Sequence, residues 1–168
     1  MLLYLWGAIV LFASCNRSVK YNQYAHTSVV GWEKNDVLSF DVPPLEQDGE
    51  YARQLGLRIT SAYPFMSLSL IVDTKKWSAG TVPSDYTQSR DTLQCELINN
   101  EGRSLGQGIG SYQYTFSLPT VHYAAGDSLH IEVRHDMKRE ILPGISDVGV
   151  KLLCPLHISS SINSQEDK

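Results

Sequence analysis

The chain has 168 residues, with 14 Lys and Arg against 18 Asp and Glu, so its net charge is mildly negative. This charge balance, together with the lack of a basic stripe, excludes a typical nucleic-acid-binding protein. A hydrophobic content of 42% is ordinary for a globular domain and excludes a long disordered chain.

An apolar run at residues 2–13 opens the chain. It is shorter than the roughly 20 residues that a membrane-spanning helix needs, but it suits the apolar core of a secretory signal. Small residues precede Cys15 as in a bacterial lipobox, although Phe12 stands where Leu is usual and no Lys or Arg precedes the run. We therefore expect residues 1–14 to be a lipoprotein signal peptide and Cys15 to carry a lipid. A buried N-terminal element and a secreted protein without a lipid are the alternatives.

The segment after Cys15 is mostly polar, and we expect residues 15–34 to be a tether between the lipid and the fold. Beyond it, apolar and polar residues alternate with a period of two, which is typical of half-buried strands. Seven segments show this alternation: 37–42, 54–60, 68–72, 92–97, 111–118, 129–136 and 147–152.

Each of these segments has one apolar face, which a second sheet can cover. Removing residues 1–14 leaves 168 − 14 = 154 residues, which suits one domain. We therefore predict a single all-β domain over residues 35–156, an antiparallel β-sandwich of jelly-roll-like form. The polar residues 157–168 lack periodicity and are expected to form a disordered tail.

The residues that could carry chemistry form no catalytic pattern. There is no G-x-S-x-G motif, and the glycine-rich segment 102–110 is not followed by a helix that could bind a phosphate. His130 and His135 differ by five positions on one expected strand, so they lie on opposite faces and cannot share a metal. Glu132 and Asp136 share one strand face with Arg134 between them, which indicates a solvated face with compensated charges. We expect no catalytic residue, metal, cofactor or small-molecule substrate.

Two further cysteines, Cys95 and Cys154, share the parity of apolar neighbours and should point into the core. An exported protein can form a disulfide, but the sequence does not show whether the two residues are close enough. A Cys95–Cys154 disulfide and two buried free thiols both remain open.

Three aromatic residues fall in expected loops: Trp77, Tyr86 and Tyr123. Such residues can anchor a protein partner or a sugar, and they can also cover the open end of a sandwich core. Asp147 begins the last expected strand, where it can form a strand-end hydrogen bond or contact a partner.

Several segments together resemble the GldH family of gliding-motility lipoproteins from Bacteroidetes. The matching segments, in order, are the lipobox ending in Cys15, Tyr21-Asn22-Gln23-Tyr24, Gly31-Trp32, Val37–Pro43, Tyr63-Pro64-Phe65, Leu68–Val72, Asp91-Thr92-Leu93, Leu105–Gly108, Ile131–Met137 and Gly144–Val150. The resemblance implies a non-enzymatic accessory or structural lipoprotein of the gliding apparatus and its associated secretion system. Its implied partners are the membrane, through the lipid on Cys15, and other envelope proteins.

No acidic residue occurs in the four positions after Cys15. Acidic residues there favour surface display in Bacteroidetes, so we expect the periplasmic face of the outer membrane. The alternative function is a carbohydrate-binding β-sandwich at the cell surface, which requires a row of exposed aromatic residues on one sheet. Instead, Tyr112, Tyr114 and Phe116 share the apolar parity of their segment.

Overall fold

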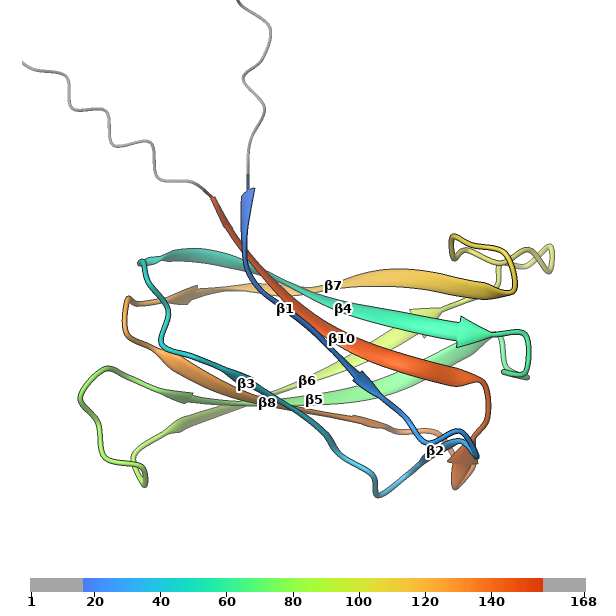
Figure 1. Ribbon diagram of the computed structural model, residues 1–168, viewed down its shortest axis with the longest axis horizontal. Helices are drawn as coiled ribbons and strands as arrows, with labels where there is room; N and C mark the ends of the chain where they lie inside the picture. Colours follow the sequence, from blue (N-terminus) through green and yellow to red (C-terminus); the bar gives the residue numbers. More distant parts are fainter. Residues whose placement is uncertain (1–16, 156–168) are drawn as a thin grey trace, which may run out of the picture.

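The computed structural model describes residues 17–155, which form antiparallel strands without a helix in that range (Figure 1). The strands are β1 (Arg17–His26), β2 (Trp32–Glu33), β3 (Leu38–Val42), β4 (Gly49–Thr60), β5 (Ser67–Trp77), β6 (Thr87–Glu96), β7 (Ser111–Tyr123), β8 (Ser128–His135), β9 (Ile141–Leu142) and β10 (Ile145–Pro155). All seven segments that alternate in the sequence lie in or largely within strands.

Two four-stranded sheets make up the sandwich, with the strand orders β1-β10-β4-β7 and β3-β8-β5-β6. The short strands β2 and β9 pair separately beside them. Successive long strands alternate between the two sheets, except for the β5–β6 hairpin, in the manner of an eight-stranded jelly roll. The predicted all-β, jelly-roll-like sandwich is therefore confirmed.

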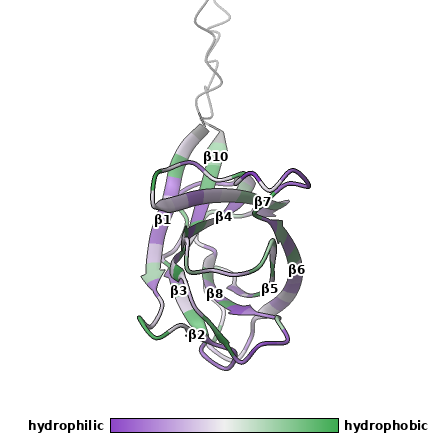
Figure 2. Ribbon diagram, turned by 90° about the vertical axis from the view of Figure 1, so that its right-hand side faces the viewer, coloured by the Kyte–Doolittle hydropathy of each residue, from purple (hydrophilic) through white to green (hydrophobic). Residues whose placement is uncertain are grey.

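Viewed along its strands, the sandwich encloses one interior between its two layers (Figure 2). The alternation of burial is most regular in β8, where buried and half-buried residues alternate without a break. Its inward residues Leu129, Ile131 and Val133 face the apolar residues of β4 and β10, such as Leu55 and Val150. Burial of these side chains, at about 25 cal/mol per Å² of apolar surface, is the main force that holds the sheets together.

The first strand corrects the expected tether. Residues Arg17 to His26 form β1, which pairs antiparallel with β10 from Pro155 to Asp147. This segment is polar because an edge strand buries only one side, here through Tyr21, and leaves its other described side chains half-buried or exposed. A tether over residues 15–34 is therefore wrong, and the domain includes residues from Arg17 onward. Cys15, the expected signal peptide and the expected tail lie outside the described residues.

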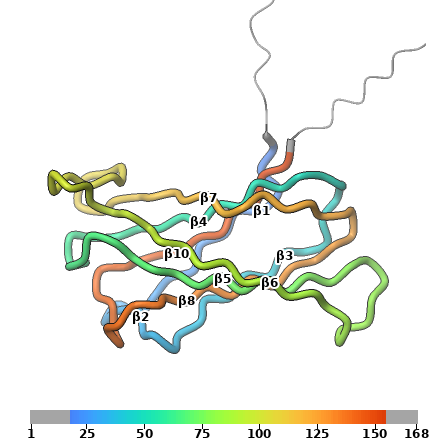
Figure 3. Tube along the Cα trace, turned by 180° about the vertical axis from the view of Figure 1, so that it is seen from behind, coloured from blue at the N-terminus to red at the C-terminus, as the bar shows by residue number. Residues whose placement is uncertain are grey.

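Both ends of the described chain lie side by side, because Arg17 is paired with Pro155. In Figures 1 and 3, the start of β1 and the end of β10 rise above the sandwich on the side of the β1-β10-β4-β7 sheet. The outer face of the β3-β8-β5-β6 sheet points the opposite way.

Candidate functional site

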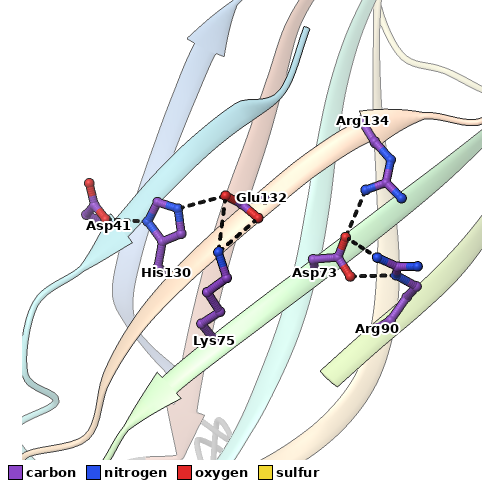
Figure 4. A network of polar contacts seen from close by, with 7 residues as sticks. All are labelled: Asp41, Asp73, Lys75, Arg90, His130, Glu132 and Arg134. Carbon is purple, nitrogen blue, oxygen red and sulfur yellow. Dashed lines mark hydrogen bonds and ion pairs between the residues drawn. The ribbon is translucent and has the colours of Figure 1, made fainter. Parts of the chain in front are cut away.

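The outer face of the β3-β8-β5-β6 sheet carries a network of charged side chains around Asp73 (Figure 4). Arg90 of β6 donates two hydrogen bonds to this carboxylate, Nε to Oδ1 at 2.6 Å and Nη2 to Oδ2 at 3.1 Å. Arg134 of β8 donates a third, Nη1 to Oδ2 at 2.8 Å. The two guanidinium groups cover Asp73 so well that it is 3% exposed, although it points away from the core.

These hydrogen bonds hold the pKa of Asp73 below its usual range, with the bond from Arg90 contributing most. The carboxylate is therefore ionised and fixed in position at neutral pH. Bidentate Arg–carboxylate pairs are among the strongest polar contacts in proteins, so the centre of this face is preorganised.

A second group of side chains continues the network toward β3. The ring of His130 lies between two carboxylates, with Nδ1 2.6 Å from Asp41 Oδ1 and Nε2 3.3 Å from Glu132 Oε1. Nζ of Lys75, on β5, lies 3.4 Å from Glu132 Oε2. The register explains the grouping, because Lys75 and Asp41 both pair with His130. All four strands of the sheet thus contribute to one polar surface.

An aromatic pair adjoins this surface. Trp77 ends β5 and Tyr86 precedes β6, and their ring centroids are 5.4 Å apart with 46° between the planes. The indole Nε1 of Trp77 donates a hydrogen bond to the carbonyl of Pro83 at 2.9 Å, which fixes the ring against the β5–β6 loop. Tyr86 remains 44% exposed. The two predicted contact residues are therefore brought together.

The aromatic pair and part of the polar network line one open groove of about 610 Å³. Its lining residues are Asp41, Val42, Pro43, Lys75, Trp77, Tyr86, Ser128, Leu129 and His130. A half-buried Trp and an exposed Tyr beside fixed hydrogen-bonding groups are typical of protein-binding hot spots. We take this groove and the Asp73 network as the candidate binding face.

The other two predicted contact residues lie elsewhere. Tyr123 is only 3% exposed and packs against Tyr51, with ring centroids 5.6 Å apart, so it belongs to the core. Asp147 lies in the opposite sheet and is 6% exposed. It accepts a hydrogen bond from Ser146 Oγ at 2.9 Å and lies 2.5 Å from His26 Nδ1. Its contacts are those of a strand-end hydrogen-bonding residue.

Both described cysteines are buried free thiols, as one of the two alternatives predicted. Cys154 lies beside Gly49 at the start of β4, whereas Cys95 pairs with Leu68 at the start of β5. These strand starts are at opposite ends of the sandwich, which contradicts the alternative of a Cys95–Cys154 disulfide. Burial raises the pKa of Cys95 to about 12, which leaves its thiol protonated and unreactive.

Within residues 17–155, no group of three or more His, Cys, Asp or Glu side chains is arranged to hold a metal ion. His135 is buried against Trp32, with ring centroids 5.3 Å apart, while His130 lies in the outer network. The two histidines therefore face opposite sides of the sheet, as the spacing predicted. The same range contains no helix that is long and apolar enough to cross a membrane.

Asp73, at the centre of the network, was not among the site residues predicted from the sequence. The sequence does indicate that Asp73 faces outward, because it has the opposite parity to Leu70 and Val72. Its partners Arg90 and Arg134 could not be found from parity alone. They meet Asp73 only because β6 and β8 flank β5 with the observed register.

The profile of the GldH lipoprotein family matches residues 19–152. The chain belongs to this family. A relative named gliding motility lipoprotein GldH, from Flavobacterium johnsoniae, is 32% identical over 155 residues, which cover 88% of this chain and 92% of the relative. The resemblance seen in the sequence is thereby confirmed for the GldH family.

Solved structures show weaker similarity. An aminopeptidase from a Thaumarchaeota archaeon matches with a TM-score of 0.37 and 12% identity, covering 83% of this chain and 31% of the aminopeptidase. The chain thus spans about a third of that enzyme. The Eiger TNF structure from S. frugiperda matches with a TM-score of 0.28 and 11% identity, covering 83% and 96% of the two chains. These similarities carry no argument about function.

Proposed function

We propose that this GldH-family protein is a non-enzymatic lipoprotein of the outer membrane that serves gliding motility and the associated secretion machinery as an accessory or structural component. It acts by binding other envelope proteins. Family membership supports the cellular role. The observation that carries the mode of action is the face where Trp77 and Tyr86 adjoin the Asp73 network.

A lipid on Cys15 would hold the domain close to the membrane. Arg17, the start of β1, is only two positions after Cys15 in the chain. At 3.3–3.6 Å per residue, these two steps span at most about 7 Å. Since β1 begins on the side of the β1-β10-β4-β7 sheet, that sheet faces the membrane and the candidate binding face points away from it. On the periplasmic side, this orientation leaves the face open to envelope proteins.

The candidate binding face suits a protein partner for two physical reasons. Its charged groups are already paired, so binding does not leave an isolated charge without water. Its aromatic rings are held in place before binding, so less side-chain entropy is lost on association. Trp and Tyr are also the residue types that most often dominate binding energy at protein interfaces.

Purification of the lipid-anchored protein from its native envelope tests the proposal. The double variant Trp77→Ala with Tyr86→Ala should lose proteins that copurify with the wild type under gentle solubilisation. The matched control is Val29→Ala with Val30→Ala, which trims two exposed apolar side chains in the β1–β2 loop. Recovery of the wild type as a lone monomer would contradict the proposal.

The lipid anchor has a separate test. Metabolic labelling with palmitate should mark the wild type and not Cys15→Ser. Label that persists in the substituted protein would contradict anchoring through Cys15.

Carbohydrate binding is a second candidate function for the same groove. It is favoured by the aromatic pair beside Asp41, Lys75 and His130, because sugars combine ring stacking with hydrogen bonds to polar groups. A glycan array decides between the two functions. Sugar binding that Trp77→Ala abolishes would support this second function, and no binding by the wild type would exclude it for the sugars on the array.

A further inference from the structure

The outer face of the β1-β10-β4-β7 sheet contains a polar hollow of about 210 Å³. Its lining residues are Asn22, Tyr24, Gln54, Gly56, Arg58, Gln113, Thr115, Gly149 and Lys151. The lining includes a guanidinium, an ammonium, three amides and two hydroxyls, and it includes no carboxylate. All of these groups can donate hydrogen bonds, so the hollow is suited to an anion.

Two glycines create the floor of the hollow. Gly149 of β10 pairs with Gly56 of β4 on one side and with Tyr24 of β1 on the other. A Cβ atom at Gly149 would lie 2.6 Å from Cε1 of Tyr24, and one at Gly56 would meet the Tyr24 hydroxyl. The absence of both side chains allows the Tyr24 ring to lie across the sheet as one wall of the hollow.

The two cations flank this floor from the neighbouring rows of the sheet. Arg58 stacks on Tyr24, with its Cζ 4.4 Å from the ring centroid, and its Nη1 lies 3.8 Å from Asp147 Oδ2. Lys151 pairs with Asn22 and Gln54, and no ion pair involves it within residues 17–155. The hollow thus combines a guanidinium held against Tyr24 with an ammonium that has no counter-ion among the described residues.

We propose that this hollow binds the phosphate group of an anionic membrane lipid. Guanidinium and ammonium groups bind phosphate through charge-assisted hydrogen bonds, and the amide and hydroxyl groups supply further donors. The choice of a lipid as the source rests on the proposed anchor at Cys15, which brings this sheet toward the membrane. Headgroup binding would orient the domain and keep the candidate binding face away from the lipid surface.

Nuclear magnetic resonance of the lipidated full chain in nonionic detergent micelles tests the proposal. The signals to follow are the backbone amides of Gly56 and Gly149. Phosphatidylglycerol is titrated into the micelles in one arm, and inorganic phosphate is added in the other. The double variant Arg58→Gln with Lys151→Gln removes both cations, while Lys138→Gln with Arg139→Gln removes two exposed charges outside the hollow as the matched control.

Phosphatidylglycerol should shift both glycine signals saturably, and the double variant should bind about tenfold more weakly or worse while the control is unchanged. Lys151→Gln alone, which breaks no ion pair among the described residues, should weaken binding in the same direction if the double variant unfolds. Equal weakening in the control would overturn the proposal, as would the absence of a saturable shift. Shifts with inorganic phosphate but not with the lipid would overturn the lipid as the source. None of these results depends on the candidate binding face. The proposal of headgroup binding and the proposal of partner binding can therefore fail separately.

Discussion

Arg53 of β4 reaches through the core to Asp91 of β6 in the opposite sheet, with 3.0 Å between Arg53 Nη2 and Asp91 Oδ2. The guanidinium is almost fully buried, and its Nε donates a hydrogen bond to the carbonyl of Pro119 at 2.9 Å. One charged contact therefore joins the two sheets of a sandwich that is otherwise held together by apolar packing.

Asp91→Asn should lower the free energy of unfolding by about 3 kcal/mol, because it leaves a buried guanidinium without its counter-charge. Urea unfolding followed by tryptophan fluorescence measures this loss. Asp85→Asn, in the exposed β5–β6 loop, is the control and should change stability by less than about 0.5 kcal/mol. Equal stability of Asp91→Asn and wild type would show that the ion pair contributes nothing.

Gly149→Ala should destabilise the domain by about 1–3 kcal/mol, the usual cost of overpacking, because the new methyl group collides with Tyr24. A double-mutant cycle isolates this clash. In the Tyr24→Ala background the same substitution should cost much less, since the ring is gone. Additive effects of the two substitutions would contradict the observed contact between Tyr24 and Gly149.

His135 should make the stability of the domain depend on pH. Burial lowers the pKa of His135 below its ordinary value of 6.5, so the folded protein keeps the ring neutral when the unfolded chain takes up a proton. Stability is then full above about pH 6.5 and falls as the pH drops below it. Urea unfolding between pH 7.5 and 5 should show a smaller fall in His135→Gln than in wild type. Identical pH profiles would contradict this assignment.

Cys95 should resist alkylation in the folded protein, because burial raises its pKa to about 12. Iodoacetamide followed by peptide mass analysis should leave Cys95 unmodified in native protein. In denaturant without reductant, both Cys95 and Cys154 should be alkylated. If both cysteines remain unmodified until reductant is added, they form a disulfide, which would contradict the free thiols of the structure.

The strands of the core could be predicted from the sequence because their burial follows a period of two, as in Leu129, Ile131 and Val133. The first strand could not, since an edge strand such as Arg17–His26 buries few side chains and resembles a polar linker. Tyr123 was placed in a loop because the end of β7 has no clear alternation. Composition and parity describe one strand at a time.

The candidate binding face depends on how strands pair, which local sequence does not encode. Trp77 and Tyr86 could be chosen as aromatic residues near a loop, and the hairpin of β5 and β6 brings them together. Asp73 meets Arg134, 61 positions later in the chain, only through the pairing of β5 with β8. Likewise, the hollow under Tyr24 requires β1, β10 and β4 to lie side by side.

The central claim is that the candidate binding face contacts an envelope protein, and site-specific photocrosslinking in the native envelope tests it most directly. A benzophenone amino acid is placed at Tyr86 in one variant and at exposed Ser117, on the opposite sheet and outside the polar hollow, in another. We predict that position 86 cross-links to one defined envelope protein and that position 117 does not. Cross-links to the same protein from both positions, or none from position 86, would contradict the claim.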